Sequence, residues 1–202
     1  METRKFKSVS YMTEELRKQI HHTATELFRK KGLKFTMEDI AREMHVAKKT
    51  IYKLYPSKED LLMDLVKTGF EEIQNCKREI LESDLPMKKK IEKVLIAMPD
   101  NYKSIDFRNL SVLEEKYPNV FQEISRQLES EWDPIYQLLE EGKRMHCVND
   151  VSLPVVKQMV TASFDSFLYA DDLKRAGITY QEALQEMVTI IMKGVWNDST
   201  EQ

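Results

Sequence analysis

The chain has 202 residues, of which 31 are Lys or Arg and 34 are Asp or Glu, giving a formal net charge of −3. A chain of this length can bury a large hydrophobic core without disulfide bonds to stabilise it. Cys76 and Cys147 form no paired motif, so we expect neither a disulfide nor a zinc site. No apolar run is long enough for a signal peptide or a membrane span. We therefore expect a cytoplasmic protein that does not bind membranes.

The charge is distributed unevenly along the chain. Residues 1–60 contain 14 Lys and Arg but only 9 Asp and Glu, a formal charge of +5, so residues 61–202 carry −8 of the total of −3. A basic N-terminal part attached to an acidic remainder is typical of a polyanion-binding module whose partner domain stays away from DNA. The split favours nucleic acid as the partner of the N-terminal part.

The first dozen residues, 1–12, show no apolar periodicity and include three basic side chains. We expect a flexible N-terminal arm there, which either adds contacts to DNA or remains a disordered tail. From Thr13 onward, apolar residues recur at three- and four-residue intervals, which predicts an amphipathic helix with Gly32 as its C-cap. His21 and His22 lie about 100° apart on this helix, with no Cys or carboxylate cluster beside them, so we expect packing or solvation rather than metal binding.

Two short helices and a turn are predicted next. Thr36 is a favourable N-cap followed by two acidic residues in the first turn, where the helix dipole favours negative charge. The apolar pattern is interrupted at residues 45–47 and resumes from Lys48 until Pro56 ends the second helix. Ser57 then caps a long third helix of this segment.

The predicted second helix has Lys, Thr and Tyr side chains on its exposed face. A short helix, a three-residue turn and a second short helix with an exposed basic face form a helix-turn-helix. In this motif the second helix, the recognition helix, lies in the major groove of DNA. We expect the Lys and Tyr side chains to contact phosphates, and Lys48, Lys49 and Thr50 at the helix start to reach base edges. Solvated lysines on short amphipathic helices also occur in many all-helical proteins, but the charge split weighs against that alternative.

The block FTMEDIAREMHVAKKTIYKLYPSKEDLL, with the helix before it, resembles the N-terminal DNA-binding domain of the TetR family of transcriptional regulators over about residues 13–66. The resemblance implies an all-α fold, in which a three-helix helix-turn-helix domain is joined by a long fourth helix to an all-helical ligand-binding and dimerisation domain. We accordingly predict an arm at 1–12, a DNA-binding domain at 13–56 and an effector-binding and dimerisation domain at 57–202.

The resemblance also implies which residues contact DNA. The predicted set is Thr36, Lys48, Lys49, Thr50, Tyr52, Lys53 and Lys58. Three positions depart from the family pattern, because His45 stands where Gly is usual, Ala47 replaces a Ser-like cap, and Leu54 replaces a frequent His. The operator sequence is therefore not transferable from a relative.

Helices are also predicted beyond residue 66, separated by proline and turn signals. Pro134 lies inside a long apolar pattern, so we expect a kink or break near Glu131. The two closing helices, which begin at Ser152 and Thr179, have apolar faces wider than one intramolecular contact needs. This width favours packing across a two-fold axis onto a second copy, as the resemblance also implies. The predicted homodimer interface consists of Val156, Val160, Met187, Ile191 and Val195.

An effector pocket is expected in the acidic helical part. The chain contains 11 Met, 8 Phe, 8 Tyr and 2 Trp, and an adaptable Met-rich and aromatic lining suits a small apolar or aromatic ligand. The same residues at helical spacing are also typical of an ordinary core. The predicted pocket residues are Met98, Tyr102, Phe107, Trp132, Tyr136, Phe164 and Phe167.

The sequence thus predicts a DNA-binding transcriptional regulator, a repressor that binds a palindromic operator as a homodimer and is released by a small-molecule effector. No Gly-rich phosphate loop, HExxH or nucleophile motif occurs, so we expect no catalytic activity, no cofactor and no metal. Two alternatives remain open. One is a helical enzyme that uses the N-terminal helices only as scaffold, and the other is a regulator controlled by a protein partner.

Overall fold

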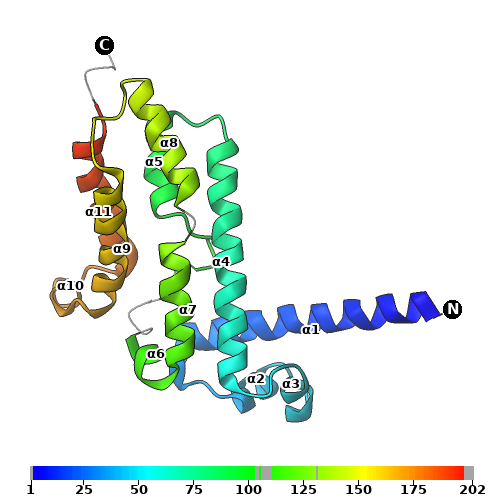
Figure 1. Ribbon diagram of the computed structural model, residues 1–202. Coiled ribbons are helices and arrows are strands. Elements are labelled where there is room, and N and C mark those ends of the chain that lie inside the picture. The colour runs from blue at the N-terminus through cyan, green and yellow to red at the C-terminus, as the bar shows by residue number, and fades with distance from the viewer. Residues whose placement is uncertain (1, 103–104, 106–110, 131, 198–202) are drawn as a thin grey trace. The chain divides into compact units, whose positions relative to one another are not determined.

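The computed structural model describes the backbone of residues 2–102, 105, 111–130 and 132–197, and the side chains of residues 13–102, 105, 112–130 and 132–197. Within these residues the helices are joined by turns and short irregular segments, and the one β-type pairing is an antiparallel bridge between Val148 and Trp196, so the predicted all-α class is confirmed. Figure 1 shows the elements, which are α1 (Glu2–Lys31), η1 (Gly32–Lys34), α2 (Met37–Glu43), α3 (Lys48–Leu54), α4 (Lys58–Glu82), α5 (Met87–Leu95), α6 (Ser111–Lys116), α7 (Pro118–Glu129), α8 (Asp133–Arg144), α9 (Leu153–Tyr169), α10 (Asp171–Arg175) and α11 (Tyr180–Val195).

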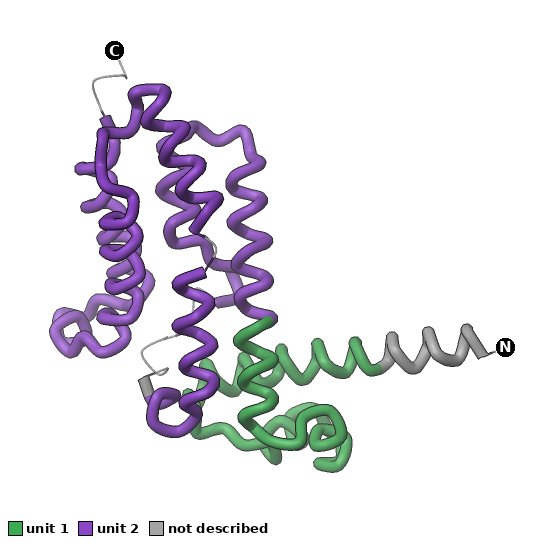
Figure 2. Tube along the Cα trace, viewed as in Figure 1, with its two compact units in different colours: residues 1–67 green, residues 68–202 purple. Residues whose placement is uncertain are grey.

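The chain divides into two compact units, which Figure 2 draws in different colours. Unit 1 is Met1–Lys67 and unit 2 is Thr68–Gln202. Helix α4 contains residues of both, so the polypeptide passes from one unit to the other without leaving the helix. The prediction placed the boundary between domains at residue 57, where α4 begins.

Helix α1 extends back to Glu2, whereas the sequence pattern placed its start at Thr13. The side chains of residues 1–12 lie outside the described residues, and the arm expected there stays a prediction. At the other end, Gly32 has a φ of 57°, in the left-handed region that glycine adopts without steric cost. This residue ends α1 as predicted and lets the chain turn into η1.

Side-chain caps fix where the helices of unit 1 begin. The Thr36 hydroxyl accepts from the Asp39 amide at 3.1 Å, and the Asp39 carboxylate accepts from the Thr36 amide at 3.0 Å, forming a capping box. Ser57 and Asp60 make the same reciprocal pair at the start of α4, at 3.1 and 3.0 Å. The predicted caps Thr36 and Ser57 are therefore confirmed.

In unit 2, the predicted break near Pro134 is confirmed. Helix α7 ends at Glu129, and Pro134 lies in the first turn of α8, where the missing amide of proline costs no intrahelical hydrogen bond. Thr179 and Glu182 form a capping box at the start of α11, which confirms the predicted start of that helix. The short helix α10 between α9 and α11 was not predicted, because its five residues are too few for a periodic signal.

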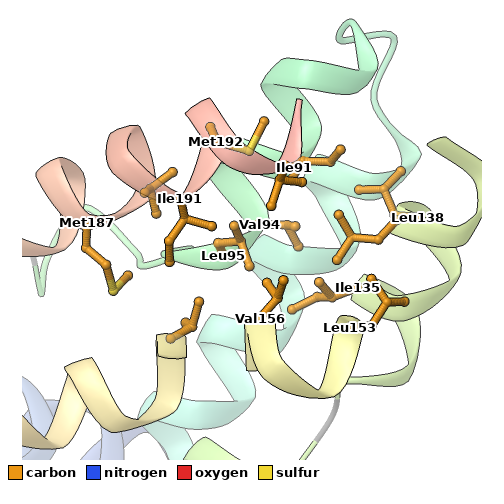
Figure 3. Close-up of a cluster of buried hydrophobic side chains, with 14 of the residues drawn as sticks. Ile91, Val94, Leu95, Ile135, Leu138, Leu153, Val156, Met187, Ile191 and Met192 are labelled. Carbon is orange, nitrogen blue, oxygen red and sulfur yellow. The ribbon is translucent and has the colours of Figure 1, made fainter. Parts of the chain in front are cut away.

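The core of unit 2 forms where α5, α8, α9 and α11 converge, as Figure 3 shows. Helix α5 contributes Ile91, Val94 and Leu95, and apolar side chains of the other three helices close over them. The five predicted dimer-interface residues all belong to this core, with exposed fractions from 0 to 8%. They are Val156, Val160, Met187, Ile191 and Val195. Side chains covered by their own chain leave little area for a second copy, and the predicted interface stays a prediction.

A candidate DNA-binding surface

Helices α2 and α3 of unit 1 pack through a small apolar face. Ile40 and Ala41 of α2 and Ile51 of α3 are buried, together with Tyr55, the C-cap residue of α3. Because α3 has only seven residues, this inward stripe determines which side chains face outward. Lys48, Lys49, Tyr52 and Lys53 are exposed and Thr50 is half-buried, so the predicted contact residues of α3 share the surface of one helix.

The turn between α2 and α3 needs a left-handed residue, and His45 supplies it with a φ of 54°. The Val46 amide donates to the Ala41 carbonyl at 3.0 Å, which closes the turn on the end of α2. Ala47 is the N-cap of α3 and makes no side-chain cap. His45 therefore adopts a left-handed conformation that costs it more than it would cost Gly, and Ala47 leaves the start of α3 without a side-chain cap.

A carboxylate of α2 engages the first residue of α3. The Lys48 ammonium lies 3.0 Å from Oε1 of Glu38, and the two side chains are 62% and 42% exposed. Hydrogen bonding from Lys48, with a smaller contribution from the Tyr52 hydroxyl, holds the pKa of the Glu38 carboxyl below its usual range. One of the predicted DNA contacts is thus already paired within the free chain.

Lys58 differs from the other predicted contacts, because its ammonium donates to backbone carbonyls of its own unit. Nζ lies 2.6 Å from the Leu33 carbonyl oxygen and 2.5 Å from that of Phe35, and 4.1 Å from the centroid of the Phe35 ring. These contacts tie the start of α4 to the segment before α2. We infer that Lys58 contributes first to the arrangement of the domain, and its predicted phosphate contact is untested.

Four polar side chains from α1, the end of α3 and α4 meet behind this surface at Asp64. The Asp64 carboxylate accepts two hydrogen bonds from Arg17 at 2.8 Å each and one from the Tyr55 hydroxyl at 2.5 Å, and lies 2.9 Å from Nε2 of His21. We call Arg17, His21, Tyr55 and Asp64 the Asp64 cluster. Sequence analysis missed it, because the three residues that contact Asp64 lie 9 to 47 positions away from it and share no pattern with it.

The pKa shifts in the Asp64 cluster follow from these contacts. Hydrogen bonds from Arg17 hold the pKa of Asp64 well below its usual range. Burial is the main cause that raises the pKa of Tyr55, and burial also lowers the pKa of His21 despite the nearby carboxylate. The cluster therefore contains an ionised Asp64 and a neutral His21 at pH 7, and it joins three helices of unit 1.

The predicted pocket residues are only partly brought together. The rings of Trp132 and Tyr136 lie 6.1 Å apart between centroids. Phe164 and Phe167 are partly buried against the core of unit 2, and so is Tyr136. Tyr102 stands near Gly69 of α4, with its hydroxyl 3.6 Å from where a Cβ would lie.

Two further predicted pocket residues complete the set. Met98 is half-buried in the segment after α5, since that helix ends at Leu95 rather than reaching residue 98. Phe107 lies outside the described residues. The pocket therefore stays a prediction.

Comparison with known proteins agrees with this geometry. Residues 20–65 match the family described as bacterial regulatory proteins, tetR family. The chain is 24% identical over 182 residues to YvaF of Bacillus subtilis (strain 168), an uncharacterized HTH-type transcriptional regulator, and this alignment covers 90% of the chain and 96% of YvaF.

Solved structures share the fold. A transcriptional regulator of the TetR/AcrR family from Thermobifida fusca YX-ER1 superposes with a TM-score of 0.65 at 23% identity, over 89% of this chain and 98% of that one. A Saccharomonospora viridis protein solved in complex with choline gives a TM-score of 0.62 at 15% identity, over 91% and 99% of the two chains.

A short helix with a buried inner face, followed by a turn and an exposed basic helix, defines a helix-turn-helix protein, and with the regulators it matches the chain is a DNA-binding transcriptional regulator. Residues 20–65 thus carry the sequence of a tetR-family DNA-binding domain, and the whole chain shares its fold with a solved TetR/AcrR regulator. Among the described residues, no helix combines the length and the hydropathy that a membrane crossing requires.

Proposed function

We propose that the chain is a repressor that binds a palindromic operator as a homodimer and is released when a small-molecule effector binds unit 2. The outer face of α3 carries this proposal. Lys49 and Lys53 are exposed there beside Tyr52, whose side chain is 39% exposed although aromatic rings are usually covered. Phosphate contacts by such side chains supply affinity, and the residues at the start of α3 supply contacts to bases.

A homodimer requires an apolar surface on the outside of the closing helices. Val155 and Met159 of α9 and Ile190 of α11 are 56, 52 and 58% exposed, although they are large and apolar. Covering such a surface with a second copy removes it from water, and a two-fold axis then places two recognition helices about 34–36 Å apart, or a multiple of that spacing. The expected interface therefore contains these residues in place of their buried neighbours.

The effector is proposed to bind among the aromatic residues of unit 2, around Trp132 and Tyr136. The choline held by the Saccharomonospora viridis protein supports a site for a small organic molecule in a chain of this fold. Since α4 belongs to both units, a ligand that changes the position of α4 residues in unit 2 also acts on unit 1. By linkage, such an effector binds the operator-bound protein more weakly than the free protein, and equal affinity contradicts the proposal.

Selection from a pool of random duplexes at several salt concentrations tests the DNA part. We expect a palindromic consensus and a steep loss of affinity with salt. Lys49→Ala and Tyr52→Phe are expected to weaken binding and lower the salt slope by up to about one unit for the lysine, whereas Lys174→Ala on α10 is the matched control. Absent or salt-independent binding contradicts DNA recognition.

Sedimentation of Ile190→Glu tests the dimer. This substitution places a charge in the proposed interface and is expected to yield monomers that lose the preference for palindromic sites. The control is Gln185→Glu, which adds the same charge at an exposed position of α11 about 140° around the helix axis from Ile190. A monomeric wild type, or a dimer that is unaffected by Ile190→Glu, contradicts this interface.

The proposed site of action of this DNA-binding protein is the cytoplasm. The proposal assigns the chain binding rather than catalysis.

A further inference from the structure

Glu38 is an acidic residue in the middle of an otherwise basic and polar set of predicted DNA contacts. It follows the N-cap Thr36 on α2, and its carboxylate reaches across to α3, where Oε1 lies 3.0 Å from the Lys48 ammonium. Lys48 and Tyr52 are four residues apart and so lie on the same side of α3. The ion pair with Lys48 therefore brings the Glu38 carboxylate to the side of α3 that also carries Tyr52.

The neighbouring acidic residues are engaged differently. The Asp39 carboxylate accepts a hydrogen bond from the Thr36 amide and forms ion pairs with Arg42 and Lys31. Its charge therefore stabilises the start of α2. Glu43, at the exposed end of the same helix, has no described contact with α3. Among the described acidic residues of α2, Glu38 is therefore the one that directly occupies a predicted DNA contact.

A carboxylate and a DNA phosphate are alternative partners for the same ammonium group. When Lys48 binds a phosphate, it must leave Glu38 or share its donors with it, and the carboxylate then lies close to a second negative charge. Exposed ion pairs are individually weak, so this competition modulates binding and does not abolish it.

We propose that Glu38 limits the affinity of the protein for DNA, because its carboxylate holds Lys48 in the free chain and competes with phosphate for it. This inference rests on the proposed function, since it concerns the same surface. Removing the Glu38 charge is expected to strengthen binding to DNA, whereas removing any of the predicted DNA-contact side chains is expected to weaken it.

Glu38→Gln is the direct test, measured on a random-sequence duplex at several salt concentrations, so that no operator need be known. We expect affinity to rise about three- to tenfold at low salt, a range that includes the lost pair and the lost repulsion from phosphate. The salt slope is expected to steepen by up to about 0.9, because the unpaired Lys48 then releases its own counterion on binding.

A double-mutant cycle separates this effect from a general change of charge. In a Lys48→Ala background, Glu38→Gln is expected to have a clearly smaller effect than in the wild type, because the competing partner is gone. Glu43→Gln is the matched control on the same helix, and it is expected to change affinity less than twofold. Circular dichroism of each variant checks that α2 keeps its fold.

Each outcome decides the inference. Tighter binding that depends on Lys48 supports it. Weaker binding of Glu38→Gln, an effect equal to that of Glu43→Gln, or an effect unchanged in the Lys48→Ala background overturns it while the proposed function stands, because wild-type binding is measured in the same series. Absence of salt-dependent binding by the wild type overturns both.

Discussion

Arg17 of α1 and Asp64 of α4 form a two-pronged ion pair, with Nε and one terminal nitrogen of the guanidinium each 2.8 Å from a carboxylate oxygen. This geometry matches the planar fork of arginine to the planar carboxylate, and it is stronger and more directional than a single contact. Tyr55 and His21 also bind the Asp64 carboxylate, so these contacts connect the C-terminal end of α3 to α1 and α4. The stability of unit 1 should therefore depend on the charge of Asp64.

Asp64→Asn is expected to destabilise unit 1 by about 1–3 kcal/mol, because it leaves Arg17 without its charged partner while keeping an acceptor for Tyr55. Chemical denaturation followed by circular dichroism measures this loss. Glu43→Gln removes an exposed carboxylate of the same unit and is expected to change stability by less than about 0.5 kcal/mol. An Asp64→Asn protein as stable as the wild type would show that the cluster contributes nothing to the fold.

The Asp64 cluster also predicts how stability depends on pH. Burial lowers the pKa of His21 from 6.5, so the unfolded chain binds a proton there more readily than the folded chain does. Stability is therefore present above about pH 6.5 and is lost as the pH falls below it, and Asp64, whose pKa is also lowered, adds a further loss below about pH 4. His21→Gln is expected to flatten the pH dependence between about pH 8 and pH 5, measured by thermal unfolding. His22→Gln, on the exposed neighbour, is the control and should retain the wild-type curve.

Local signals in the sequence were sufficient to place the starts of α2, α4 and α11. Thr36, Ser57 and Thr179 each stand three residues before the acidic partner of their cap, so the pattern and its physical cause lie within one turn. The Asp64 cluster could not be predicted from the sequence, because Arg17 and Asp64 are 47 residues apart and only the folded chain brings them together. Contacts of this kind need the packing of three helices to be known first.

The side of α9 and α11 that stays exposed could not be predicted from the sequence for a different reason. In α9 and α11 an apolar residue often follows another, as in Val155 and Val156, Met159 and Val160, or Ile190 and Ile191. Periodicity shows that such helices have two apolar sides, but it does not tell which side the chain covers itself. The structure buries the second residue of each pair and exposes the first.

His45→Gly is expected to stabilise unit 1 by up to about 1 kcal/mol. His45 has a φ of 54°, and glycine occupies this region without the clash of a Cβ atom, although its greater freedom in the unfolded chain offsets part of the gain. Thermal unfolding measures the change. His45→Val is the opposite test, because a β-branched residue fits this region poorly, and a valine variant as stable as the wild type would contradict the assignment of the turn.

Ala47→Ser is expected to add a missing cap to α3. Ala47 has extended backbone angles, φ −67° and ψ 141°, which suit an N-cap whose hydroxyl accepts from an amide of the first turn. We expect a gain of about 1 kcal/mol in the free energy of unfolding of unit 1. The reciprocal change Thr36→Ala removes a cap that α2 already has and should cost a similar amount. If Ala47→Ser leaves stability unchanged, the start of α3 is satisfied by other means.

Two glycines of unit 2 predict opposite effects of the same substitution. A Cβ on Gly142 would lie 2.5 Å from Cγ2 of Val148 and 3.3 Å from Sδ of Met87, so Gly142→Ala forces the bridge residue Val148 to move. We expect a loss of about 1–3 kcal/mol from overpacking. Gly194, inside α11, has no described atom within 4 Å of the position that an alanine methyl group would take, so Gly194→Ala is expected to gain about 0.5–1 kcal/mol from the lower entropy of the unfolded chain. Thermal unfolding of both variants compares them directly, and a destabilised Gly194→Ala with an unaffected Gly142→Ala contradicts the packing around Val148.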